Sequence, residues 1–337
     1  MSTLRLERVI PQGGVLGGRV TVHGTGIDPQ QLADCRVVFG SHATRPVLTT
    51  TTLLLAIVPE NASGPVIQLQ QGERTSNTLP FVVGSLLAEN LHPVANPVVD
   101  RQGTIYTTIS GTKSQQVPVS LYHVTRFGEV EPFAEGVLNP TGLAFGPDGD
   151  LYVSSRHEGT VYRVDRQGNV SQFAKNLGIA TGLAFDTLGR LYVGDRRGTI
   201  YQVSDTGQTR AVAKLGPSVT AYHLAFGPDE QLYVSFPTLS GADTIYRLPP
   251  NEPPQTFVTG LGRAQGIAFD AEDNLYAVAY AGGEGGIMKI TPDGTIQHVI
   301  AGIHLVGLAF GADGDLILTD NSALYKVGLG VQGRPLP

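Results

Sequence analysis

Short runs of alternating apolar and polar residues recur along most of the chain. From Pro140 they follow a pattern of about forty residues, PTGLAFGPDGDLYVSSRHEGTVYRVDRQGNVSQFA and its continuation, which returns four more times. The landmark phenylalanines of these five copies are 40, 41, 43 and 41 residues apart: Phe145, Phe185, Phe226, Phe269 and Phe310. A diverged earlier copy, VANPVVDRQGTIYTTIS, places Val99 at the same position. The pattern therefore indicates six units.

Each unit contains four short runs with the alternation of β-strands, such as TGLAF, LYVSS, TVYRV and VSQFA, separated by turn clusters such as GPDGD. Four short strands in about forty residues are typical of one blade of a β-propeller. A small residue recurs in the first run, where the innermost strand should crowd toward the axis: Ala144, Ala184, Ala225, Ala268 and Ala309. We predict a six-bladed β-propeller over residues 85–337.

The last unit lacks a convincing fourth strand, because VGLGVQGRPLP follows its third run. Upstream, the segment SLLAENLHPVANP aligns with SQFAKNLGIATGL, so residues 85–88 match the fourth run of a unit. We expect these residues to pair with the C-terminal strand near Leu324 and to close the ring, which protects sheet edges that would otherwise be open.

Residues 1–84 lack the forty-residue pattern and instead hold six or seven short alternating strands with glycine-rich turns, which is the size and pattern of a small β-sandwich. Pro11, the Gly17-Gly18 pair, the VTVHGTGI run, VVFG and the closing SNTLPFVV resemble the IPT/TIG family of immunoglobulin-like domains. The resemblance implies a spacer or a protein or carbohydrate contact surface without catalytic residues. The expected fold is all-β: a small immunoglobulin-like β-sandwich, then a six-bladed β-propeller.

The charge and the hydropathy of the chain limit the classes of partner and the locations that can be expected for the protein. The chain has 23 basic and 29 acidic residues and a net charge of −6, so a nucleic-acid partner is not expected. Apolar stretches are far shorter than the roughly 20 residues of a membrane span, and the N-terminus lacks the apolar core of a secretory signal. We expect a cytoplasmic monomer, or a secreted protein if Met1 is not the native start. Cys35, the lone cysteine, is expected to be buried.

The repeated phrase GLAFGPDGDLYV resembles the six-bladed propellers of the senescence marker protein/gluconolactonase family and those of NHL-repeat proteins. In the former family the resemblance implies a divalent ion such as calcium, held by a glutamate, by an asparagine in a PNG turn and by an aspartate after the LYV strand. Asp195 in LYVGD and Asp320 in LILTD match the aspartate, and we take them as candidate metal ligands, for calcium or zinc, and catalytic groups. The asparagine position holds other residues here, among them Thr141 and Gln265, and no matching glutamate is found.

Polar residues gather where the connections between blades and the turns between second and third strands should open on one face of the propeller. This mouth of the channel is the expected binding site. Its candidate ligand-binding residues are Thr141, Arg156, Thr181, Arg197, Tyr222, His223, Gln265 and His304. Two pairs, His157 with Glu158 and His223 with His304, are candidate acid/base groups or transition-metal ligands. The arginines are suited instead to an acidic ligand, because guanidinium pairs with carboxylate or phosphate.

Two functions remain open. The absent asparagine and glutamate favour a binding or interaction protein, with a small-molecule, protein or carbohydrate ligand at the channel mouth and no enzymatic activity. The alternative is a divalent-metal-dependent, gluconolactonase-like hydrolase of lactones or related esters, in which the metal would polarise the carbonyl and activate water. Propellers host both functions, so the fold does not choose between them.

Overall fold

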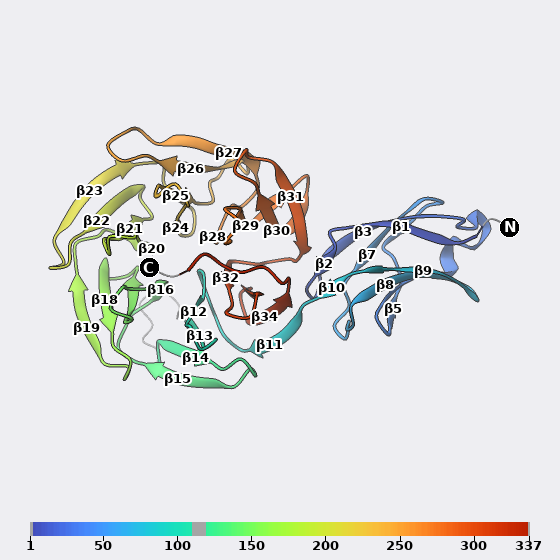
Figure 1. Ribbon diagram of the computed structural model, residues 1–337, viewed down its shortest axis with the longest axis horizontal. Helices are drawn as coiled ribbons and strands as arrows, with labels where there is room; N and C mark the ends of the chain where they lie inside the picture. Colours follow the sequence, from blue (N-terminus) through green and yellow to red (C-terminus); the bar gives the residue numbers. More distant parts are fainter. Residues whose placement is uncertain (1–2, 110–118, 336–337) are drawn as a thin grey trace.

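The computed structural model describes residues 3–109 and 119–335 and is all-β, with its strands in small, mostly four-stranded sheets consistent with a propeller. Figure 1 shows a ring of sheets, with the C-terminus near its centre, and a smaller body that carries the N-terminus. The 3₁₀ helix η1 (Pro29–Asp34) lies in that smaller body. No helix among the described residues is long and apolar enough to cross a membrane.

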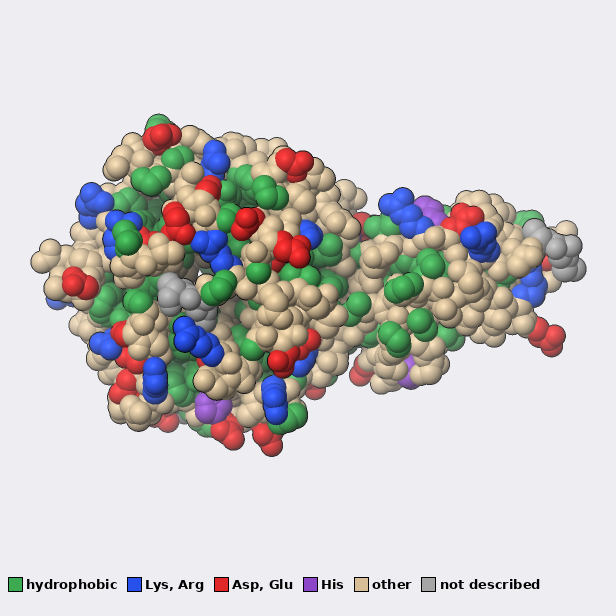
Figure 2. All heavy atoms as spheres, viewed as in Figure 1, with side chains coloured by type: hydrophobic (Ala, Val, Ile, Leu, Met, Phe, Trp, Pro, Cys, Tyr) green, Lys and Arg blue, Asp and Glu red, His purple; other side chains and the backbone are tan. Residues whose placement is uncertain are grey.

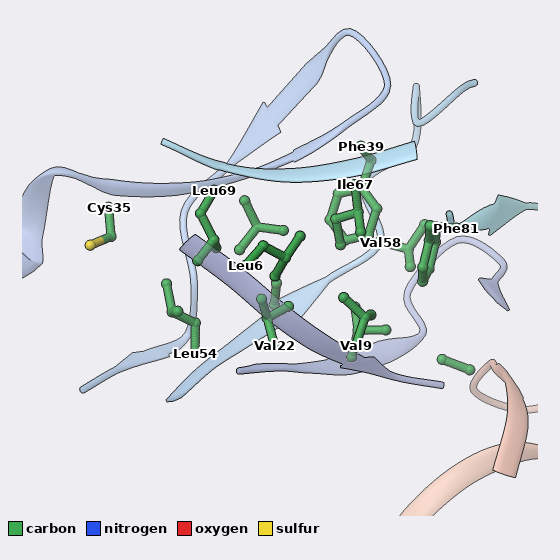
Figure 3. Packing of buried hydrophobic residues seen from close by; sticks show 14 of the residues in the cluster. Leu6, Val9, Val22, Cys35, Phe39, Leu54, Val58, Ile67, Leu69 and Phe81 are labelled. Atoms are coloured by element: carbon green, nitrogen blue, oxygen red, sulfur yellow. The ribbon is translucent and has the colours of Figure 1, made fainter. Parts of the chain in front are cut away.

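The N-terminal body consists of two four-stranded sheets over one apolar core (Figure 3). The first sheet has the order β1 (Arg5–Ile10), β3 (Arg19–Thr25), β7 (Leu53–Ile57), β6 (Leu48–Thr49). The second has the order β5 (His42–Thr44), β4 (Cys35–Phe39), β8 (Val66–Gln71), β9 (Arg74–Pro80). Every second side chain of β3 and β8 is buried, so Val22 and Leu69 share the core. Cys35 is buried there as predicted, and burial raises the pKa of its thiol.

The ring contains six sheets in the described residues. In the first four, antiparallel strands follow one another along the chain, and the last two also include strands from further upstream. The first sheet contains β12 (Val98–Val99), β13 (Ile105–Thr108), β14 (Leu121–Val124) and β15 (Val130–Ala134). The second contains β16 (Pro140–Phe145), β17 (Leu151–Ser155), β18 (Thr160–Val164) and β19 (Val170–Ala174). The third contains β20 (Ala180–Phe185), β21 (Leu191–Asp195), β22 (Thr199–Val203) and β23 (Thr209–Lys214). The fourth sheet contains β24 (His223–Phe226), β25 (Leu232–Ser235), β26 (Asp243–Leu248) and β27 (Gln255–Leu261). The fifth includes β28 (Ile267–Phe269), β29 (Leu275–Ala281), β30 (Glu284–Ile290) and β31 (Ile296–Ala301). The sixth contains β32 (Gly307–Phe310), β33 (Asp315–Thr319), β34 (Ala323–Gly328) and β11 (Ser85–Glu89). The first strands of these sheets contact one another around the centre of the ring.

The landmark phenylalanines hold neighbouring sheets together. Each one packs edge-on against the tyrosine of the preceding sheet's second strand, with ring centroids 4.9 to 5.4 Å apart. The pairs are Tyr106–Phe145, Tyr152–Phe185, Tyr192–Phe226, Tyr233–Phe269 and Tyr276–Phe310. Such pairs contribute about 0.5–1.5 kcal/mol each beyond area burial, so the repeated phenylalanine and tyrosine together set how the sheets stack.

The ring is closed by a strand from its N-terminal side. β11 pairs antiparallel with β34, with Ser85 opposite Lys326 and Ala88 opposite Leu324, as the sequence predicted for residues 85–88. Leu91, which follows the strand, donates its backbone N–H to the carbonyl of Ser322 at 3.0 Å. The last sheet of the ring therefore takes its outer strand from a segment far upstream in the sequence.

The two bodies are joined through a shared sheet edge. The two-residue strands β2 (Gly13–Gly14) and β10 (Val82–Val83) pair in parallel, and β2 pairs with β31, so the fifth sheet of the ring has six strands. At the same joint Arg19 binds Glu284 with two hydrogen bonds of 2.7 and 2.6 Å. A methyl group on Gly18 would lie 2.5 Å from the carbonyl oxygen of Ala301, so only glycine allows this approach.

Candidate functional site

The centre of the ring narrows at the starts of its first strands because glycines face the neighbouring backbone there. A methyl group on Gly142 would lie 2.0 Å from the carbonyl oxygen of Thr181, and one on Gly307 would lie 2.5 Å from that of Ala95. Gly182 and Gly266 occupy the matching positions of two other sheets. The remaining two sheets carry a larger polar residue at this point, Asn96 and His223.

Asn96 ties three sheets together across the narrow end. Its Nδ2 donates to the carbonyl of Ile267 at 3.0 Å, and its Oδ1 accepts the backbone N–H of Leu308 at 3.1 Å. His223 is buried, and its Nε2 has no hydrogen-bond partner among the described residues. Burial lowers the pKa of His223 to about 4, so the ring is neutral at pH 7.

Four predicted ligand-binding residues are buried at this end and bonded within the protein. The hydroxyl of Thr181 donates to the carbonyl of Gly194 and accepts the backbone N–H of Tyr222, both at 3.0 Å. Gln265 donates from Nε2 to the carbonyl of Leu305 at 3.1 Å, and Thr141 donates to the carbonyl of Asn139 at 3.4 Å. The Thr181 and Gln265 bonds link adjacent sheets.

Tyr222, the fourth of these residues, has its hydroxyl donating to the carbonyl of Gly216 and its ring stacked on Phe236 with centroids 4.5 Å apart. Two serines that the sequence did not single out make further ties between sheets. Ser154 and Ser235 donate to the carbonyls of Thr181 and Gln265, each at 2.5 Å. The sequence feature that could have identified these two serines is the hydroxyl residue that follows the LYV motif of the second strand.

The two candidate metal-ligating aspartates accept hydrogen bonds from backbone N–H groups: Asp320 from its own turn, and Asp195 from its own turn and from the connection that precedes β20. Asp195 is buried, and its Oδ1 accepts from Ile179 at 2.9 Å and from Arg197 at 3.0 Å. Asp320 accepts through Oδ1 from the backbone of Ser322 and of Ala323, both at 2.7 Å. Within residues 3–109 and 119–335, no three His, Cys, Asp or Glu side chains lie together as a metal-binding group.

The remaining candidates are exposed on loops. His157, Glu158 and His304 all have exposed side chains. Glu158 accepts the hydroxyl of Tyr162 at 2.8 Å, and burial together with this carboxylate raises the pKa of Tyr162 to about 12. His157 and Glu158 follow β17, whereas His304 lies before β32 at another part of the ring.

Basic groups gather beside the turn that Asp195 caps. Arg156 is half-buried, and burial and, after it, the nearby charge of Arg196 lower its pKa. The guanidinium of Arg196 donates to the carbonyls of Ser218 at 3.2 Å and Val219 at 2.8 Å, which fixes its position. Arg197 is exposed next to it. Arg156 directly follows β17 and Arg196 directly follows β21, so the two guanidinium groups belong to adjacent sheets.

The opposite end of the ring opens into a cavity of about 500 Å³. Its wall is built from the ends of the first strands, with rings of leucine or isoleucine, alanine and phenylalanine side chains: Leu143, Leu183, Leu224, Ile267 and Leu308; Ala144, Ala184, Ala225, Ala268 and Ala309; Phe145, Phe185, Phe226, Phe269 and Phe310. Asp100, Arg101 and Arg334 stand at its rim. The binding site predicted from the sequence lies at the other end of the ring.

The C-terminal segment, residues 329–335, runs toward the centre of the ring (Figure 1), and residues 332–335 line this cavity. Val331 donates its N–H to the carbonyl of Gly314 at 3.1 Å, and Arg334 donates its N–H to that of Phe269 at 3.0 Å. The Arg334 guanidinium pairs with Glu230 at 2.9 Å. Figure 2 views the same side and shows basic and acidic side chains around the centre of the ring.

By sequence, no family model and no curated protein matches this chain. Among solved structures, it is similar to a calcium-binding protein, regucalcin, from Agrobacterium tumefaciens, at 18% identity and a TM-score of 0.59 over 76% of this chain and 97% of that protein. A luciferin-regenerating enzyme matches at 16% identity and a TM-score of 0.59 over 74% and 95% of the two chains. An auxiliary nutrient binding protein from Bacteroides ovatus matches at 15% identity and a TM-score of 0.56 over 97% and 98%. At these identities the likeness concerns the fold, and it supports a propeller.

Proposed function

We propose that residues 1–84 form an immunoglobulin-like sandwich of the IPT/TIG type and that residues 85–337 form a six-bladed propeller. The single core shared by the two N-terminal sheets and the six sheets of the ring support this division. The match to the nutrient binding protein spans nearly the whole of both chains, which supports one common two-part arrangement.

We propose that the protein is a binding protein whose ligand carries a carboxylate or phosphate group, held at the narrow end of the ring. The observation that carries this proposal is the placement of Arg156 and Arg196 directly after the second strands of two adjacent sheets, next to Asp195, whose Oδ1 already accepts two backbone N–H groups. A bound anion would compensate the positive charge of the two guanidinium groups. Thr181 and Gln265 support the site by linking adjacent sheets.

Citrate and inorganic phosphate are suitable probes for this site. We expect either anion to raise the melting temperature by a few degrees at low ionic strength, since a ligand that binds only the folded state stabilises it. The increase should be lost in the double variant Arg156→Gln/Arg196→Gln and kept in a control, Arg101→Gln/Arg166→Gln, which removes the same charge from exposed turns at the other end. Equal responses from the two double variants would contradict the proposal.

The second candidate is the metal-dependent hydrolase, favoured by the match of Asp195 and Asp320 to the aspartate of gluconolactonase-like propellers. Both carboxylates are held by backbone donors, so metal binding would have to use their remaining lone pairs. On the proposed binding function, calcium, zinc or EDTA should leave the melting temperature unchanged and aldonolactones should not be hydrolysed. A metal that stabilises the wild type but not Asp195→Asn, together with lactone hydrolysis, would establish the hydrolase instead.

A further inference from the structure

The cavity opposite the narrow end of the ring has a wall made mostly of apolar side chains. Three rings of apolar side chains form its wall, and its charged residues lie at the rim, where Asp100 binds the backbone of its own turn and Arg334 binds Glu230. A volume of about 500 Å³ falls within the size range of small-molecule sites. An uncharged apolar molecule is the ligand that such a wall would accept, because a charge would be desolvated there without a partner.

The C-terminal segment forms part of the same cavity. Gln332, Gly333, Arg334 and Pro335 all line it. A methyl group on Gly333 would lie 2.3 Å from the Cβ of Phe310, so the segment is pressed against the apolar wall at a position that only glycine permits. The segment is held by backbone hydrogen bonds to turns of the fifth and sixth sheets and by one ion pair to the fourth.

We propose that this cavity is a second binding site, for a small uncharged apolar molecule, and that residues 332–335 are the latch that retains it. The few hydrogen bonds of the segment are exchangeable with water, so the segment can lift without disturbing the sheets. Lifting of the segment removes part of the cavity wall, so the segment in place slows the release of a bound molecule. This site is separate from the proposed anion site at the narrow end of the ring.

N-phenyl-1-naphthylamine, an uncharged probe whose fluorescence rises in apolar surroundings, tests the site with the full-length protein. We expect saturable binding of one probe molecule to the wild type. Ala268→Leu and Ala144→Leu each add bulk to the cavity wall from a different sheet, and each should weaken probe binding by at least about tenfold. Absence of saturable binding to the wild type, or undiminished binding to both filled variants, would overturn the site.

The latch is tested by the rate of probe release in stopped-flow dilution. A chain ending at Val331 and the point variant Arg334→Gln should both release the probe faster, the shortened chain by about tenfold or more. Arg45→Gln, which changes an exposed arginine of the N-terminal body, should release it at the wild-type rate. If the shortened chain and Arg334→Gln both keep the wild-type release rate while the probe still binds, the segment is not a latch.

Discussion

Leu91→Ala is expected to lower the free energy of unfolding by about 2–5 kcal/mol, the range for large-to-small changes in a packed core. Leu91 is only 1% exposed and lies in a cluster that joins the closing strand to both of its neighbours. From the sixth sheet the cluster includes Ile317 and Leu324, and from the first sheet Val99 and Ile105. Urea unfolding followed by circular dichroism measures the change.

Leu86→Ala is the matched control for this prediction. Leu86 lies in the closing strand itself but is 48% exposed, so its truncation should change stability by less than about 0.5 kcal/mol. Similar losses in the two variants would mean that the closing segment does not seal the ring through its buried contacts.

Acidification should destabilise the protein through His223. Its pKa is about 4 in the folded state, against 6.5 for the ordinary side chain, because burial disfavours the charged ring. Between these two pH values the unfolded chain binds the proton more readily than the folded protein does. The contribution of the neutral His223 to the free energy of unfolding is therefore complete above pH 6.5 and is lost as the pH falls toward 4. A shift of this size corresponds to roughly 3 kcal/mol.

The variant His223→Gln should therefore lose less stability than the wild type between pH 6.5 and pH 4, as measured by melting temperature at each pH. His157→Gln serves as the control, because it removes a histidine whose side chain is exposed. Parallel curves for His223→Gln and the wild type would show that protonation of His223 does not limit acid stability.

The repeat made much of the ring predictable from the sequence. The spacing of the phenylalanines fixes the register of the first strands, and the LYV motif supplies the tyrosines that each phenylalanine meets. The position of the closing strand was also predictable, because SLLAEN keeps the pattern of a fourth strand although it lies far from its sheet. These features were predictable because they follow from the alternation of apolar and polar residues and from the forty-residue repeat.

The residue types alone did not show which polar side chains form hydrogen bonds within the protein. The sequence predicts Thr181 and Gln265 as ligand-binding residues, and in the structure both form hydrogen bonds that link adjacent sheets. That outcome depends on how closely the backbones approach, which the glycines at positions such as Gly142 decide. The aligned repeats did contain a usable signal. Four of the six units have glycine at one position of the first strand, and the other two have Asn96 and His223 there.

The course of the C-terminal segment was beyond prediction for a different reason. VGLGVQGRPLP has no alternation, and its position depends on acceptors and donors in the turns of other sheets, such as the carbonyls of Gly314 and Phe269. Contacts of this kind leave no periodic trace in the segment itself. The cavity that it borders was missed with it.

The closing strand also determines when the protein can finish folding. Ser85 and its partner Lys326 are 241 residues apart in the chain, so a growing polypeptide exposes one half of this pairing long before it makes the other. Until β34 has been synthesised, β11 is a strand with an open edge, and such edges invite pairing with other chains. Contacts over so long a separation form slowly. Ring closure is therefore expected to be the last and slowest step of folding, and the step at which the protein is most exposed to aggregation.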